Sequence, residues 1–142
     1  MANIVYRYRQ NYHGASTELQ KTAQRIMRKE SICGIGSYEA VNWYGVVIDV
    51  RSTKEGKAGL SVNAGEFKLV PFDGFFGDSN FVDSTSPIYQ SLLSLKKGDK
   101  VAFHGVFHKS DKDCFREMSL TENGSMTSPD FIFDFKAVIP YH

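Results

Sequence analysis

Apolar and polar residues recur with two periods along this chain, which predict strands in some segments and helices in others. Between positions 100 and 108 every second residue is apolar or glycine, as in a strand with one buried face. The preceding segment predicts a helix over 87–96, because its apolar residues fall at i, i+4 and i+7: Ile88, Leu92 and Leu95. Ser86 can cap this helix, and Pro87 suits its first turn. A helix that leads into such a strand, late in a β-rich chain, indicates a small Greek-key barrel.

The longest strand pattern covers residues 41–51, VNWYGVVIDVR, and has a glycine at its centre. Gly45 predicts a bulge or bend, which a small barrel needs at its corners. We expect the core face of this strand to consist of Tyr44, Val46, Ile48 and Val50. Further strands are expected at 59–64 and 67–73, joined as a hairpin, and at 114–120 and 131–138.

The last strand predicts which of its residues enter the core. Its alternation directs four residues inward, Phe131, Phe133, Phe135 and Ala137, and two outward, Asp134 and Lys136. Together with the neighbouring helix and strand, this predicts a core centred on Leu92, Val101, Phe103, Phe131 and Phe133. Residues 74–85 form an aromatic loop, which either plugs one barrel end or exposes Phe75, Phe76 and Phe81 as a binding site.

The N-terminal segment has a helical period instead. Residues 16–29 predict an amphipathic helix, capped by Ser16 or Thr17, with an apolar stripe of Leu19, Ala23, Ile26 and Met27. The preceding residues 6–13 alternate aromatic and basic side chains. They suit an arm that stacks on bases, or else a partly ordered terminus or an edge strand. We divide the chain into an arm and helix, 1–39, and a barrel, 40–142, which together form one structural domain.

Charge is nearly balanced overall but unevenly distributed along the chain. The 142 residues carry a net charge of +1, yet residues 1–30 hold six Lys/Arg against two Asp/Glu, and the remainder holds eleven against fourteen. A surface for a polyanion would therefore depend on the N-terminal segment or on a local patch. No apolar run approaches the ~20 residues of a membrane-spanning helix, and no intact signal peptide opens the sequence.

Candidate chemistry is sparse. His104 and His108 lie on one face of the same predicted strand, but four strand residues span roughly 13 Å. Two ligands of one zinc ion must each lie within about 2.1 Å of it, so we expect no metal site here. Zinc, nucleotide and serine-hydrolase motifs are absent from the sequence. We therefore expect no catalytic residues and no cofactor, and an enzyme is the least supported class of function.

The order of the predicted elements resembles the OB-fold superfamily, in particular its tRNA-anticodon-like and single-strand-binding branches. Trp43, Gly45 and Val46 carry the resemblance in the first strand, and L-x-x-L-x-x-G-D-x-V-x-F-x-G-x-F from Leu92 to Phe107 carries it around the fourth. The resemblance covers roughly residues 40–138, and the tail from residue 113 to 135 is similar to a group of uncharacterised bacterial proteins. The resemblance to the OB-fold implies a mainly β protein, with a five-stranded Greek-key barrel and a helix between strands three and four. The additional N-terminal helix departs from that pattern.

Two functions from different classes stay open. One is a non-catalytic module that binds single-stranded nucleic acid through aromatic stacking and basic side chains. The other is an adaptor domain for a protein, a peptide or a small ligand. The residues expected to border the binding face are Trp43, Arg51, Phe75, Phe76, Lys109 and Arg116, with Trp43 chosen because it lies opposite the expected core face of its strand.

The two cysteines, Cys33 and Cys114, are expected to approach each other if the OB-type arrangement holds. Cys33 precedes the first strand and Cys114 follows the fourth, and these strands are neighbours in an OB-fold. A disulfide between them would indicate an oxidising compartment and an exported protein, periplasmic or secreted. Two free thiols would indicate a cytoplasmic protein, and the sequence leaves both alternatives open.

Overall fold

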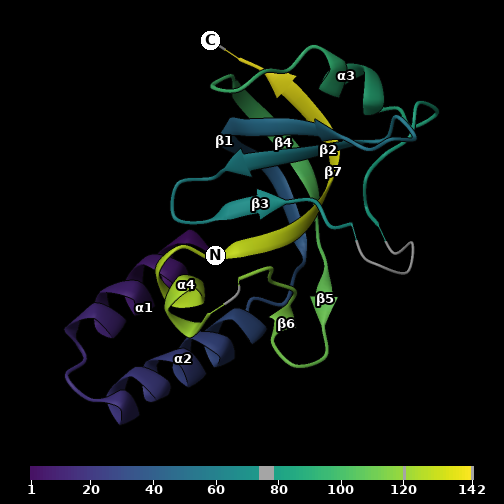
Figure 1. Cartoon of the computed structure of the whole chain (residues 1–142). Coiled ribbons are helices and arrows are strands. Elements are labelled where there is room, and N and C mark those ends of the chain that lie inside the picture. The colour runs from purple at the N-terminus through teal and green to yellow at the C-terminus, as the bar shows by residue number, and fades with distance from the viewer. Residues whose placement is uncertain (74–78, 120, 142) are drawn as a thin grey trace.

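The fold is a closed, five-stranded mixed β-barrel with two long helices packed at one end (Figure 1). A computed structural model describes residues 1–73, 79–119 and 121–141. Around the barrel the strands follow the order β1-β2-β3-β7-β4. Their bounds are β1 Glu39–Ser52, β2 Ala58–Asn63, β3 Lys68–Val70, β4 Lys100–Phe107 and β7 Asp130–Pro140.

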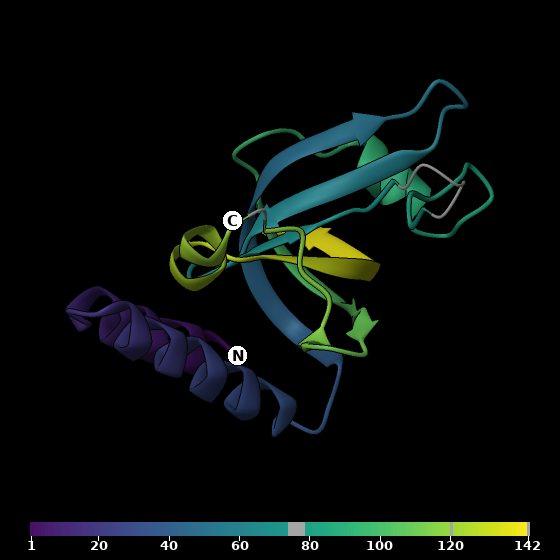
Figure 2. The ribbon, with the colours of Figure 1, turned by 60° about the horizontal axis from the view of Figure 1, so that its bottom comes forward.

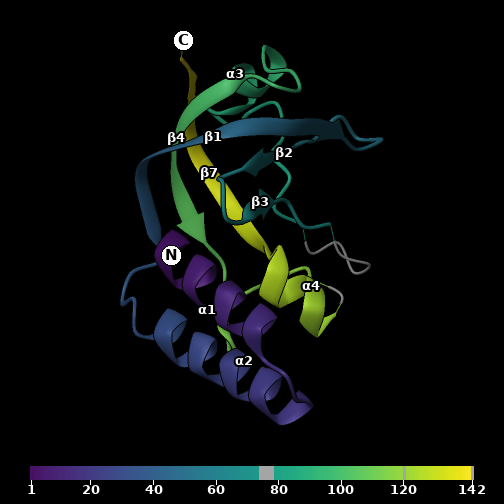
Figure 3. The ribbon, with the colours of Figure 1, turned by 90° about the vertical axis from the view of Figure 1, so that its left-hand side faces the viewer.

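Helices and a small ribbon complete the described part of the chain. The helices are α1 Ala2–Gly14, α2 Glu18–Cys33, α3 Tyr89–Leu93 and α4 Glu122–Thr127, and the ribbon is β5 Lys109–Ser110 with β6 Cys114–Phe115. Helices α1 and α2 lie side by side below the barrel, whereas α3 lies at the opposite end, near the C-terminus (Figures 1 and 3). In Figure 2 the two long helices again lie side by side at the edge of the barrel, next to α4 and away from α3.

Pairing around the barrel is antiparallel except at one junction. β1 pairs antiparallel with both β2 and β4, and β4 pairs antiparallel with β7. β3 pairs parallel with β7, but only through Lys68↔Asp130, Leu69↔Phe131 and Val70↔Ile132. The barrel is therefore closed through β3 over a short distance, and this shortness determines where the cavity described below opens.

The core predicted from the alternating pattern is confirmed. Leu92, Val101, Phe103, Phe131 and Phe133 are each at most 3% exposed. Phenylalanines from β4 and β7 meet at ring-centroid distances of 4.8 to 5.9 Å, mostly edge to face, the geometry that aromatic quadrupoles favour.

The predicted core face of β1 is wrong at Tyr44 and Val46, whereas Val50 is half-buried and packs against the core as predicted, beyond a register shift between Val47 and Asp49. Tyr44 is 60% and Val46 42% exposed, whereas Val47 is buried and the half-buried Trp43 packs on Phe103. The cause is a register irregularity between Ala40 and Trp43, where Asn42 takes a φ of 55°, so the strand turns its other face inward. Gly45 lies so close to the Val62 side chain and the Asn63 carbonyl that a Cβ would clash with both.

A one-residue shift in the register of β7 with β4 changes part of the predicted inward face of the last strand. The register changes from Gly105↔Phe135 to His104↔Ala137, so Lys136 has no opposite residue. Beyond this bulge the inward positions move by one, which exposes Ala137 and buries Val138. Phe131, Phe133 and Phe135 remain inside, as predicted.

The N-terminal segment also differs from expectation. Residues 2–14 form helix α1, not a partly ordered terminus or an edge strand. Helix α2 is capped by the Thr17 hydroxyl, which accepts a hydrogen bond from the Gln20 amide, as predicted. Its apolar stripe, however, faces solvent: Leu19 is 80% exposed, while Arg28 and Ile32 are the buried residues. The inward face packs instead on α1, where Ser31 is hydrogen-bonded to Tyr8, and on the tail, where the buried Arg28 pairs with Glu117.

The tail is less extended than its sequence suggests. Strand β6 contains only two residues of the expected strand at 114–120, and helix α4, capped by Thr121, replaces the expected loop after it. In the same way, the helix expected over 87–96 is a single turn, Tyr89–Leu93, although Ile88, Leu92 and Leu95 are all buried.

The disulfide left open by the sequence is present. Cys33 and Cys114 are bonded, with a Cα–Cα distance of 5.4 Å, and they join the end of α2 to the β5–β6 ribbon. Across the described ranges no helix has the length and apolarity to cross a bilayer.

Truncation of Phe133 tests the core. The change Phe133→Ala removes a ring that is 1% exposed and contacts Phe103, Phe107 and Phe135, so we expect the free energy of unfolding to fall by about 3–5 kcal/mol. Chemical denaturation measures this loss. The matched variant Ile139→Ala, at a position 65% exposed, should change it by no more than about 0.5 kcal/mol.

The disulfide is testable by mass. Alkylation in denaturant should label no cysteine before reduction and two after it, because the described chain has no free cysteine. The double variant Cys33→Ser, Cys114→Ser should be less stable by up to about 4 kcal/mol, since the bond closes a loop with a sequence separation of 81. Two labelled thiols in the unreduced protein would contradict the pairing.

Candidate functional site

The basic and aromatic residues chosen from the sequence do not gather at one place. Arg51 lies over the Phe81 ring, Lys109 over Tyr38 and Arg116 over Phe72, at 5.4, 5.0 and 4.1 Å from the ring centroids. Each of Arg51, Arg116 and Trp43 borders a different depression. Phe75 and Phe76 lie outside the described residues.

The basic N-terminal segment is largely neutralised within the molecule. Ion pairs join it to acidic residues elsewhere: Arg9–Glu66 at 2.6 Å, Arg25–Glu122 at 2.9 Å, Arg28–Glu117 at 2.7 Å and Lys29–Asp113 at 4.0 Å. Arg28 is buried and also donates to the backbone carbonyl and the hydroxyl of Ser125. These charges dock the helices, so they do not form a free basic surface.

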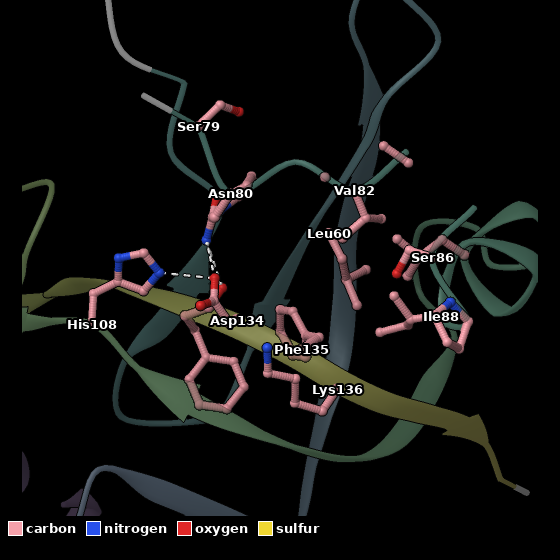
Figure 4. Close-up of a pocket in the computed structure, with 16 residues that line it drawn as sticks. Leu60, Ser79, Asn80, Val82, Ser86, Ile88, His108, Asp134, Phe135 and Lys136 are labelled. Atoms are coloured by element: carbon pink, nitrogen blue, oxygen red, sulfur yellow. Dashed lines mark hydrogen bonds and ion pairs between the residues drawn. The ribbon is translucent and has the colours of Figure 1, made fainter. Parts of the chain in front are cut away.

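The main cavity has a volume of about 510 Å³ and opens between β2 and β7 (Figure 4). It exists because β3 stops at Val70, so that over residues 133–136 β7 has no neighbouring strand on that side within the described chain. At the opening, Val82 forms a β-bridge with Ala58 of β2. Residues 86–88, which precede α3, and Leu92 of α3 bound the far end.

The cavity walls are mainly apolar at one end. They consist of Leu60, Val82, Ile88, Leu92 and Phe135 (Figure 4). Leu60, Ile88 and Leu92 are nearly fully buried, so their positions are determined by the core. Such a wall can hold an apolar group of a ligand by removing its surface from water, at roughly 25 cal/mol per Å².

The other end of the cavity carries a connected polar cluster of Asn80, His108 and Asp134 (Figure 4). Asp134 Oδ1 accepts from Asn80 Nδ2 at 2.9 Å and lies 2.8 Å from His108 Nε2. Asn80 Nδ2 also donates to the Phe133 carbonyl, while Asn80 Oδ1 accepts from the Phe72 amide. Both Nδ2 and Oδ1 of Asn80 are thus hydrogen-bonded, and these bonds hold the cluster at the edge of β7.

A tight turn positions the residues that enter the far wall. Asp83 Oδ1 accepts from the Thr85 hydroxyl and amide, and the Asp83 carbonyl accepts from the Ser86 amide. The hydrogen bonds from Thr85 lower the pKa of Asp83 below its ordinary value. The carboxylate is therefore ionised at neutral pH, and the turn holds Ser86, Pro87 and Ile88 beside the cavity.

The titratable groups of the cavity are few. His108 and Asp134 form a pair, but no cluster of three metal-ligating side chains exists in the described chain. Two residues of the polar cluster were noted in the sequence for other reasons: His108 as a histidine on a strand, and Asp134 as an outward residue of the last strand. Asn80 carried no sequence signal, because its partners lie 53 and 54 residues away.

Comparisons with known proteins add no family. The sequence matches no protein-family model and no curated protein.

Loss of the Asn80 side chain tests the polar cluster. Asn80→Ala would leave the Phe72 amide and the Phe133 carbonyl without their partner, so we expect a loss of about 1–3 kcal/mol in the free energy of unfolding. The same substitution at the exposed Asn123 of α4 should cost no more than about 0.5 kcal/mol. Equal losses in the two variants would contradict the structural role of Asn80. Denaturation curves of both proteins provide the measurement.

Proposed function

We propose that this protein is a non-catalytic binding module whose ligand occupies the cavity between β2 and β7. The observation that carries the proposal is the cavity itself, about 510 Å³, with an apolar wall at one end and a fixed polar cluster at the other. Small-ligand sites in proteins have this size and this combination of linings. The ligand class is therefore an amphipathic molecule or segment with an apolar group and a polar end.

Single-stranded nucleic acid is the second candidate. The observation that favours it lies on the outer face of β1, where the Tyr44 and Tyr141 rings are 5.2 Å apart and Tyr44 is 60% exposed. Lys100 lies opposite Val46 in the neighbouring strand and adds a positive charge there. Exposed rings with a nearby lysine suit base stacking. This proposal ranks second because the basic residues of the N-terminal helices are engaged in ion pairs.

We further infer an OB-type Greek-key topology for the barrel and an exported location for the protein. The strand order β4-β1-β2-β3 around the barrel agrees with a Greek key, and α3 lies between β3 and β4 in the chain. The Cys33–Cys114 disulfide supports an oxidising compartment. The fold supports binding by analogy only, so the cavity remains the main argument for function.

A fluorescent amphipath tests the proposed cavity. We expect 8-anilinonaphthalene-1-sulfonate to bind saturably, with its rings on the apolar wall. Ser86→Trp places an indole at the cavity rim and should weaken binding by about tenfold or more. The matched variant Ser94→Trp, at an exposed residue at the end of α3 that is not part of the cavity lining, should leave binding unchanged.

Equal affinity in the two tryptophan variants would contradict the cavity as the ligand site. Near-ultraviolet circular dichroism shows whether each variant retains its tertiary packing. This control is needed because a protein with loosened packing binds the dye outside any specific site. In parallel, a labelled oligothymidine titrated at several salt concentrations separates the second candidate. If log K for the oligonucleotide falls linearly with log salt concentration and Ser86→Trp has no effect on it, the protein is a nucleic-acid-binding module instead.

A further inference from the structure

Among the residues that the structure describes, no strand pairs with the cavity side of β7 over most of its length. β4 pairs with β7 from Phe133 to Pro140, but on the other side β3 pairs only with residues 130–132. Within the described residues, β7 from residue 133 onward therefore has one neighbouring strand instead of two. Unpaired edges are uncommon in native proteins unless they are covered, charged or used, because they can pair with another chain.

The hydrogen bonds along β7 show which main-chain groups point to this edge. The Ile132 amide and carbonyl bond to the 108–116 side, whereas the Phe133 carbonyl points to the cavity side and accepts from Asn80 Nδ2. Main-chain groups alternate between the two sides of a strand, so the amide and carbonyl of Phe135 point to the same edge as those of Phe133. Asn80 caps the first of these positions, and Phe135 presents the next donor and acceptor.

Side chains beside this edge add charge and an apolar recess. Asp134 and Lys136 lie on the outer face of β7, two residues apart, with Phe135 between them turned into the barrel beside Leu60 and Ile88. Both hydrogen bonds to Asp134 reach Oδ1, so Oδ2 can accept from a ligand, and Lys136 has no ion-pair partner in the described chain. The edge is thus bordered by an anion, Asp134, by a cation, Lys136, and by the apolar side chains of the recess (Figure 4).

We propose that the ligand of this cavity is an extended peptide that adds to β7 as a strand, pairing with the main chain of Phe135. This inference rests on the proposed function and names its ligand class. Main-chain bonds supply the affinity, as in other cases of strand addition. Specificity comes from an apolar residue that enters the recess at Leu60 and Ile88. On the outer face, a basic residue beside Asp134 and an acidic residue beside Lys136 complement the charges.

The probe is a displayed pool of random dodecapeptides, from which the best-retained peptide is synthesised. On binding, hydrogen exchange of the Phe135 amide should slow by about tenfold or more. N-methylation of the peptide at alternate amides should abolish binding in one of the two alternate sets and be tolerated in the other, because only one set faces β7. Lys136→Glu should weaken binding by about tenfold, and Lys112→Glu, an exposed control in the turn between β5 and β6, should have no effect.

The outcomes separate this inference from the proposed function. If the naphthalene probe binds in the cavity but no peptide is retained, the peptide inference is wrong and the binding module stands. A retained peptide that leaves Phe135 exchange unchanged, or that tolerates methylation in both sets, overturns strand addition. Failure of both the dye and the peptide overturns both proposals. Protection of Phe135 together with methylation sensitivity in one set establishes the inference.

Discussion

The length of β3 is the constraint on which the functional architecture depends. β3 pairs with β7 through three residues, whereas β4 pairs with seven residues of the same strand. A longer β3 would occupy the space beside Phe135 and leave no cavity. Beyond the end of β3 at Val70, Asn80 is hydrogen-bonded to β7 and Val82 forms a bridge with β2. The cavity, its polar cluster and the free strand edge all follow from this single termination.

The helical end of the molecule follows a different principle. α2 buries Arg28 against the tail and leaves Leu19, Ile26 and Met27 exposed, which reverses the usual arrangement of an amphipathic helix. Arg28 is the centre of this contact, with its guanidinium shared between Glu117 and Ser125. Removal of one partner from such a buried pair costs more than the pair contributes, so the contact specifies the docking geometry. The net charge of +1 is therefore the sum of a basic N-terminal segment and an acidic remainder, which are joined by ion pairs.

Sequence patterns predicted the parts of this fold that local alternation controls. The phenylalanines of β7 and the cap of α2 are examples, since each depends on residues a few positions apart. The faces of β1 and of the end of β7 were mispredicted because single-residue register shifts reverse inside and outside. The buried face of α2 depends on acidic residues about 90 positions away. The cavity could not be predicted from local patterns either, because His108 and Asp134 meet only when β4 and β7 pair in the barrel.

The disulfide also has a consequence in time. Its cysteines are 81 positions apart, so on a ribosome α1 and α2 emerge long before the segment to which they are tied. Chains elongate at about 5–20 residues per second, and contacts of large sequence separation form slowly even when they are stable. For several seconds the two helices have neither their acidic partners nor their covalent tie. The bond between Cys33 and Cys114 therefore cannot form until both helices and four of the five barrel strands, β1 to β4, have been synthesised.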